Sequence, residues 1–314
     1  MSLTMRLLIP ACGRGSLMKR LLDSLAEAAL PDPLRRIVVV ENGEPCGVRS
    51  LCQAAKSVGL PVEYRWSPEP SKSKALNLGF ADAADDELVV MSDDDVRFEP
   101  QTLAAYEKAA LARPDGWYFG GPFHADYEER PPAWVEPYLP PSARGWNPDP
   151  SEFDPGRSRF FGCNWAVFAR DLRAVGGFDA RYGPGTTGIA TGEETVLQAQ
   201  LHARGLKSQL VRDAVVWHFV PAERCDARWA VNRAHRHGAE RGLKTHHRGG
   251  ARVIANHALN AARFTVGRVG CSLAGPADGS ASLFFAYERA RAEGYFAGYR
   301  AANAGRTADR VATT

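Results

Sequence analysis

The sequence of 314 residues lacks the features that mark secreted and membrane-spanning proteins. Its longest apolar runs are the length of a strand, whereas a membrane-spanning helix needs about 20 apolar residues. The N-terminus has neither the apolar stretch nor the cleavage site of a signal peptide. We therefore expect a protein of the cytoplasm.

Paired cysteines and a strong net charge are also absent. The cysteines form no CxxC pair and no zinc-finger spacing, and a chain of this length does not depend on disulfides, which favours reduced thiols. They are Cys12, Cys46, Cys52, Cys163, Cys225 and Cys271. A net charge of +3 is too small to indicate a nucleic-acid partner, so we expect none.

The first half of the chain alternates apolar strands with helices of ten or more residues. Predicted strands cover residues 6–9, 35–40, 62–66 and 87–91, and predicted helices cover 17–29, 48–58 and 74–84, the last capped by Ser73. Such alternation implies right-handed crossovers and a mostly parallel central sheet flanked by helices. The expected fold class is therefore α/β and Rossmann-like.

The second half is less regular. Residues 124–159 contain eight prolines, which exclude a long helix or a central strand. This insertion is either a lid that faces an acceptor or a structural plug, because long loops of this kind tend to be functional. Predicted strands at 160–168 and 210–217 follow, with helices at 169–175 and 193–204.

The C-terminal part turns helical and basic. We predict one domain over residues 5–222, a helical basic extension over 223–302 and a disordered tail over 303–314. A solvated helix face is the default interpretation of the basic residues, and contact with an anion or with the inner face of a membrane is the alternative.

The most informative segment is the acidic run Asp93-Asp94-Asp95, which directly follows the apolar strand 87–91. Open α/β sheets bind ligands beyond the carboxyl ends of their strands. Neighbouring carboxylates repel one another unless a cation compensates, and oxygen ligands suit Mg²⁺ or Mn²⁺ beside a phosphate. The run therefore indicates a metal site that holds a diphosphate. The alternative is a solvated acidic turn that caps the next helix.

An ordered series of motifs resembles the GT-A fold glycosyltransferases of family two, over roughly residues 5–240. Its members are Arg6-Leu7-Leu8-Ile9-Pro10, Val39-Val40-Glu41-Asn42-Gly43, Ala75-Leu76-Asn77-Leu78-Gly79, Asp93-Asp94-Asp95, Gly162-Cys163-Asn164-Trp165, Gly176-Gly177-Phe178-Asp179, Gly192-Glu193-Glu194-Thr195 and His218. The resemblance implies a nucleotide-sugar donor, expected to be a UDP-sugar, a divalent cation and inversion at the anomeric carbon.

The resemblance also implies which residues bind the donor. They are Pro10, Ala11, Glu41, Lys72, Asn77, Asp93, Asp94 and Asn164. Glu41 would accept a hydrogen bond from the uridine, with a turn cap as its alternative role. Lys72, or Lys74 in its place, would reach a phosphate. Asn77 would bond a loop or the nucleotide.

Three residues are implied as metal ligands. Asp95 would bind Mn²⁺ or Mg²⁺ directly, and Asp93 would bind donor hydroxyls or reach the cation through water. His218 resembles the late histidine that completes the metal shell in some relatives, and imidazole suits Mn²⁺ better than Mg²⁺. Its alternative is a histidine without a ligand role.

Glu193 and Glu194 begin a helix after the glycine-rich loop 183–192, so both carboxylates lie at a positive helix end. Capping accounts for one of them. The resemblance implies that Glu194 is the general base and that Glu193 holds the acceptor or the loop, although Glu-Glu departs from the commoner Glu-Asp and leaves the acceptor geometry open.

The predicted function is metal-dependent transfer of a sugar to a hydroxyl of a glycan, a lipid-linked or a small-molecule acceptor. Two alternatives remain. A sugar nucleotidyltransferase would need a phosphate-binding loop after the first strand, of which residues 11–15 offer a faint version. A non-catalytic glycan-binding or scaffold subunit would not need Asp95 and Glu194.

Overall fold

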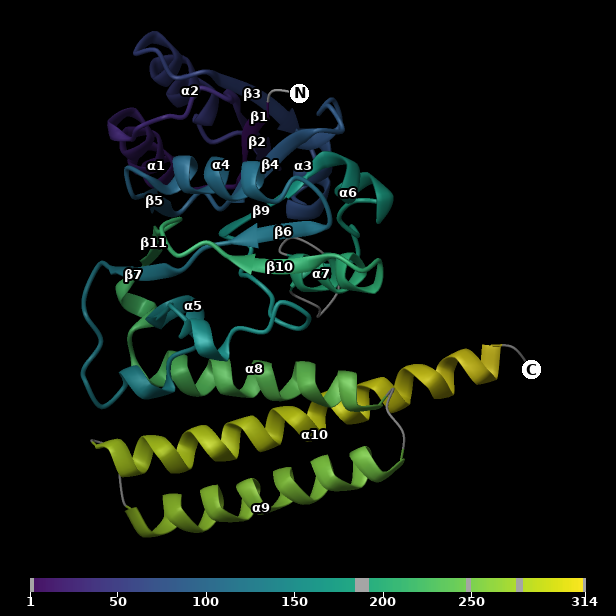
Figure 1. Cartoon of the computed structure of the whole chain (residues 1–314). Coiled ribbons are helices and arrows are strands. Elements are labelled where there is room, and N and C mark those ends of the chain that lie inside the picture. The colour runs from purple at the N-terminus through teal and green to yellow at the C-terminus, as the bar shows by residue number, and fades with distance from the viewer. Residues whose placement is uncertain (1–2, 184–191, 247–249, 275–278, 313–314) are drawn as a thin grey trace. The chain divides into compact units, whose positions relative to one another are not determined.

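The computed structural model describes residues 3–183, 192–246, 250–274 and 279–312 (Figure 1). The chain divides into two compact units. The first comprises Met1–Asp126 and Gly145–Phe219, and the second comprises Tyr127–Arg144 and Val220–Thr314. The predicted insertion 124–159 is thus shared between the units, because its residues 127–144 belong with the C-terminal helices.

Seven strands form the main sheet in the part of the chain that the structure describes, in the order β10-β6-β9-β4-β1-β2-β3. They are β1 (Thr4–Ala11), β2 (Leu34–Asn42), β3 (Val62–Ser67), β4 (Glu87–Ser92), β6 (Trp117–Gly120), β9 (Asn164–Phe168) and β10 (Lys207–Leu210). Strand β1 pairs in parallel with β2 and β4, while β9 is antiparallel to β4 and β6. The predicted mostly parallel sheet is confirmed.

A smaller sheet has the order β5-β11-β7-β8. Its strands are β5 (Val96–Phe98), β7 (Phe123–Tyr127), β8 (Gly145–Trp146) and β11 (Val216–Val220). The single strand predicted at 210–217 is wrong, because a turn at the exposed Arg212 and Asp213 separates β10 from β11 and sends them to different sheets. Antiparallel pairing of β11 with β5 sets His218 opposite Val96, next to the acidic run.

Helices cover both faces of the main sheet. Helices α1 (Gly15–Glu27), α2 (Val48–Ser57) and α4 (Thr102–Ala112) pack with one set of strand residues, and α3 (Lys72–Phe80), α6 (Ala169–Ala174) and α7 (Glu193–Ala203) with the other. Side chains alternate along β1, so that Leu7 and Ile9 join the first core and Leu8 the second. Helix α3 is capped by Ser71, whose Oγ accepts from Lys74 N, and not by the predicted Ser73, which is buried.

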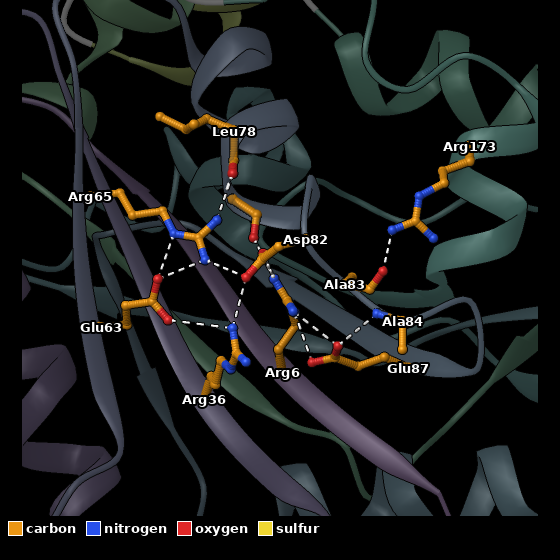
Figure 2. Close-up of polar contacts among 11 residues, drawn as sticks. Arg6, Arg36, Glu63, Arg65, Leu78, Asp82, Ala83, Ala84, Glu87 and Arg173 are labelled. Carbon is orange, nitrogen blue, oxygen red and sulfur yellow. Dashed lines mark hydrogen bonds and ion pairs between the residues drawn. The ribbon is translucent and has the colours of Figure 1, made fainter.

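A buried arginine ties the amino ends of β1 and β4 together (Figure 2). Arg6 donates to both carboxylate oxygens of Glu87 at 2.8 and 2.9 Å, and to the Gly79 carbonyl and Asp82 at 2.8 Å each. Asp82 also accepts from Arg36 and Arg65. Burial opposes ionisation of Asp82, but Arg6 and Arg65 outweigh it and hold the pKa of Asp82 well below the usual range. The network fixes the end of the sheet away from the acidic run.

The second unit is built on three long helices, α8 (Ala227–His246), α9 (Gly250–Ala274) and α10 (Ser280–Ala312), which lie side by side (Figure 1). Helix α10 therefore extends into the segment 303–314 that we predicted to be disordered. The residues before β8 add short helices, η1 (Glu136–Tyr138) and α5 (Pro141–Arg144), and the Tyr138 and Tyr287 rings lie 5.4 Å apart. Short helices η2 (Pro150–Glu152) and η3 (Ala222–Arg224) complete the elements.

Glycines bring the backbones of α8 and α10 into contact. A Cβ on Gly238 or Gly242 would overlap a carbonyl oxygen of α10, and a Cβ on Gly294 or Gly298 would overlap one of α8. Both pairs are spaced four residues apart, which places each pair on one helix face. This spacing permits a close approach that larger residues would prevent.

We expect Gly242→Ala to lower the free energy of unfolding by about 1–3 kcal/mol, because the added methyl group overpacks this contact. The matched control is Gly250→Ala in α9, where a Cβ meets nothing within 4 Å. It should change the free energy of unfolding by less than about 0.5 kcal/mol, because Gly250 is the first residue of α9 and its added Cβ makes no contact. Urea denaturation followed by circular dichroism measures both, and equal effects of the two substitutions would contradict the packing argument.

Candidate active site

Three central strands end at the same edge of the main sheet and deliver polar residues to one place. A cavity of about 160 Å³ lies there, lined by Pro10, Cys12, Arg14, Asn42, Pro70, Lys72, Asp93 and Asp94. Of the predicted donor-binding residues, Pro10, Lys72, Asp93 and Asp94 are thus brought together. A larger cavity of about 650 Å³, between α2 and β3, contains none of the predicted residues.

Two cations compensate the charge of the acidic run. Arg14 forms ion pairs with Asp95 and, at 3.4 Å, with Asp94, while Lys72 Nζ lies 2.5 Å from Asp93 Oδ1. Burial raises the pKa of Asp94 to about 6 against the opposing charge of Arg14. Burial acts on Asp93 in the same direction, but the charge of Lys72 outweighs it and lowers the pKa of Asp93.

Asp95 and His218 form a pair with free ligand atoms. Asp95 Oδ1 is buried without a hydrogen-bond partner, and His218 Nε2 lies 3.6 Å from it. Among the described residues, no group of three or more His, Cys, Asp or Glu side chains is arranged to hold a metal ion. An oxygen and an imidazole nitrogen still suit Mn²⁺, and two protein ligands leave room for phosphate oxygens. The donor set therefore fits a divalent cation that takes its remaining ligands from outside the protein.

The two glutamates at the start of α7 reach the same site. Their helix begins after Gly192, whose φ of 95° favours glycine. Lys72 Nζ lies 3.0 Å from Glu193 Oε1 and so bridges the acidic run to α7. Glu194 is close to Lys72 as well. A Cβ built on Gly162 would lie 3.2 Å from Lys72 Nζ and 3.7 Å from the carboxylate carbon of Glu194, so both groups lie next to Gly162.

Glu194 has the titration behaviour of a base that works near neutral pH. Burial and the neighbouring charge of Glu193 raise the pKa of Glu194 to about 7. A general base is most effective when its pKa lies near the operating pH. The position of Glu194 at the site and its raised pKa thus agree with a role in proton removal.

Other predicted residues are engaged within the protein. Glu41 is buried and accepts from Cys46 N at 2.6 Å and from the Tyr64 hydroxyl at 2.5 Å. These bonds outweigh the effect of burial and lower the pKa of Glu41. The neighbouring Asn42 lines the cavity and donates to the carbonyl of the buried Ala11. The predicted donor contacts of Glu41 and Ala11 stay predictions.

The two predicted asparagines also bond other parts of the chain. The predicted partner of Asn77 is either a loop or the nucleotide. In the structure, its amide donates to the Phe178 carbonyl and accepts from Phe178 N, both at 2.8 Å, so Asn77 bonds a loop. Asn164 donates to the carbonyls of Pro122 and Ala214, and its oxygen accepts from Tyr106. These bonds use both amide hydrogens of Asn164. Its contact with the nucleotide-sugar donor stays a prediction.

Sequence reasoning missed Arg14 and Asn42 and left the choice of lysine open. Arg14 lies in the segment 11–15, which we considered only as a faint phosphate-binding loop, and it is the cation that follows β1 at the site edge. Lys72 lies in the site, whereas Lys74 is half-exposed and pairs with Glu69. A basic residue shortly after a central strand is the sequence feature that could have identified Arg14.

Comparison with known proteins identifies the family. A sequence model described as "Glycosyl transferase family 2" matches residues 7–175, more than half of the chain. The chain belongs to glycosyl transferase family 2. The predicted family and GT-A fold are confirmed by this match and by similar solved structures.

Solved structures share the fold of this family 2 chain at low sequence identity. One is the mannosyltransferase PcManGT from Pyrobaculum calidifontis in complex with GDP-Man and Mn²⁺, with a TM-score of 0.58, 18% identity, and coverage of 95% of this chain and 86% of that one. GalNAc-T7 with UDP, GalNAc and Mn²⁺ has a TM-score of 0.53, 13% identity, and coverage of 76% and 50%. S. aureus TarS residues 1–349 have a TM-score of 0.53 and 11% identity, with coverage of 96% of this chain and 92% of that one. A search of curated sequences finds no match.

Lys72→Met should lower the free energy of unfolding of this family 2 protein by about 3 kcal/mol, because it leaves the buried Glu193 and the partly buried Asp93 without their shared cation. Lys74→Met removes the same charge from a half-exposed pair and should cost no more than about 1 kcal/mol. Denaturant titration in the presence of a chelator compares the two variants. Similar losses would argue against the bridging role of Lys72.

Proposed function

We propose that this family 2 protein transfers a sugar from a nucleoside diphosphate sugar to an acceptor hydroxyl, with a divalent cation and with inversion at the anomeric carbon. The observation that supports it most is the meeting of the acidic run, a partly free Asp95–His218 pair and a glutamate of raised pKa around Lys72. The solved structures that share the fold include complexes with GDP-Man and Mn²⁺ and with UDP and Mn²⁺.

Asp95 and His218 would hold the cation, which supplies positive charge for the departing diphosphate. Asp93 would bind donor hydroxyls, since Lys72 keeps it ionised and in place. Arg14 and Lys72 are the cations at the cavity, and both can reach phosphate oxygens once a donor is bound. Pro10 and Asn42 would line the pocket of the base.

Glu194 would remove the proton of the acceptor hydroxyl. Desolvation and the neighbouring charge of Glu193 raise the pKa of Glu194 to about 7, which makes the protonated form easy to reach near neutral pH. The acceptor oxygen would then attack the anomeric carbon from the face opposite the diphosphate, in a single displacement. Glu193, held by Lys72, would position α7 and the acceptor. The acceptor class stays open between a glycan, a lipid-linked and a small-molecule hydroxyl.

The nucleotide we propose is UDP, because Glu41 lies near the carboxyl end of β2, where the family usually holds an acidic residue toward uridine. Glu41 accepts one bond at each oxygen, from Cys46 N and from the Tyr64 hydroxyl, and each oxygen keeps a lone pair with which it could accept a bond from the base. If the protein binds GDP in preference to UDP, the proposed nucleotide is wrong. The proposed transfer chemistry would not change.

UDP with Mn²⁺ should raise the melting temperature more than UDP alone, because a ligand that binds only the native state stabilises it by mass action, about 2.7 kcal/mol at a hundred times its Kd. Asp95→Asn should remove the metal-dependent part of the shift. Asp32→Asn, at an exposed position, is the control that should keep it. A panel of UDP, GDP and their sugar derivatives measures this, and no metal-dependent stabilisation by any of them would refute the proposed cofactor.

Glu194→Gln should lower the rate of transfer by about 10²–10⁴-fold and leave nucleotide affinity nearly intact, because it removes the base and not the donor site. The wild-type rate should rise with pH through about 7, since Glu194 acts only when it is ionised. Glu27→Gln, on the exposed end of α1, is the control. Assays of sugar transfer and of pyrophosphate release also separate the alternatives. Near-normal transfer by Glu194→Gln would refute the base, and release of pyrophosphate from a nucleoside triphosphate would indicate a nucleotidyltransferase.

A further inference from the structure

The outer face of α9 is apolar and exposed to solvent. Its large apolar side chains are Ile254, Leu259, Val266 and Val269, with exposed fractions of 71%, 43%, 48% and 52%. Small residues fill the space between them, namely the exposed Ala251, Ala255, Ala258, Ala261 and Ala262. A continuous exposed apolar face of this kind is a common sign of an interaction site.

The charges on α9 border this face. At about 100° per residue, the exposed apolar positions cover an arc of about 160°. Arg252 lies at one border near the start of the helix, and Arg268 lies at the other border near its end. Neither arginine forms a salt bridge with another described residue, and the sequence of α9 contains no Asp or Glu. The face is therefore mainly apolar in the middle, where the exposed Thr265 and Ser272 are its polar residues, and cationic on both sides.

The opposite side of α9 already holds the helix in its unit. Arg263 pairs with Glu288 of α10 at 2.8 Å, and Gly267 and Gly270 lie against Arg289 and Phe285. The outer face contributes nothing to these contacts. In the part of the chain that the structure describes, no helix combines the length and hydropathy needed to cross a bilayer. An occupant of the face would therefore lie along α9.

The charge pattern decides between a second copy of the chain and an anionic surface. If two copies paired through this face, neither copy would offer an acidic residue to Arg252 or Arg268 of the other, because α9 contains no Asp or Glu. The four arginines would border one apolar interface without a compensating charge. An anionic lipid surface instead complements both arginines and takes up the apolar middle.

More cations lie beside the Arg252 border. A cavity of about 470 Å³ between the three helices is lined by His237, Glu240, Arg241, Lys244, Thr245, Asn256, Tyr287 and Arg291. Asn256 follows Arg252 by one helical turn and accepts a hydrogen bond from Arg241. Neither Lys244 nor Arg291 has a salt bridge with another described residue. This cavity can take a lipid phosphate next to the apolar face.

We propose that α9 lies flat in the surface of an anionic lipid bilayer, with Ile254, Leu259 and Val266 among the acyl chains and Arg252 and Arg268 at the phosphates. The proposal goes beyond the transfer reaction and does not depend on it. It accounts for an apolar helix face that the fold leaves exposed and for the distribution of charge around it.

Co-sedimentation of the full-length protein with vesicles tests the proposal. Phosphatidylcholine vesicles that contain phosphatidylglycerol should bind the protein, and pure phosphatidylcholine vesicles should bind it much more weakly. Ile254→Asp should weaken binding about tenfold or more, because it places a charge among the acyl chains. Val58→Asp is the matched control, since Val58 is also 71% exposed and carries the same change of charge in the other unit.

A second variant separates the apolar and the charged contributions. Arg252→Gln with Arg268→Gln should weaken binding to the anionic vesicles about fivefold per arginine and abolish most of the preference for them. Circular dichroism checks that each variant keeps its helices. The proposal is overturned if wild-type protein does not bind anionic vesicles, if Val58→Asp and Ile254→Asp lose equal affinity, or if Ile254→Asp instead dissociates a dimer in light scattering.

Discussion

The arrangement of the site depends on the compensation of carboxylate charge by two cations. Asp93, Asp94 and Asp95 follow β4, and Glu193 and Glu194 begin α7, so five acidic groups meet at the edge of the sheet. Arg14 and Lys72 pair with four of them. Arg14 comes from the segment that follows β1, and Lys72 is the first residue of α3. Charge balance thus links four separate elements, and the one carboxylate left over has a pKa near neutrality.

The two ends of the main sheet differ in how completely their buried polar groups are hydrogen-bonded. At the amino ends of its central strands, Arg6 forms four hydrogen bonds that satisfy its guanidinium and fix β1 against β4. At the carboxyl ends, Asp95 Oδ1 remains buried without a partner. Buried polar groups are normally hydrogen-bonded, and exceptions gather at functional sites. The complete bonding at one end gives a rigid base for the incomplete bonding at the other.

Much of the fold follows from local patterns, whereas the site depends on contacts between distant segments. Alternating apolar strands and helices predicted the sheet, and the acidic run marked its functional edge. The pairing of Arg14 with Asp95 could not be predicted, because 81 residues separate the two. Saturation of Asn164 by internal bonds was equally invisible, since its partners come from three other segments. The apolar face of α9 was missed because arginines dominate the composition around it.

The late position of β9 in the chain has a consequence during synthesis. Strands β1 to β4 can assemble as soon as residue 92 has emerged, but the partner that covers the open edge of β4 begins only at Asn164. At about 5–20 residues per second, this edge waits for several seconds. Its sequence, Leu88 to Met91, is apolar and rich in β-branched residues, which makes an unpaired edge prone to aggregation. The nascent chain is therefore most in need of a chaperone while residues 93–163 are being made.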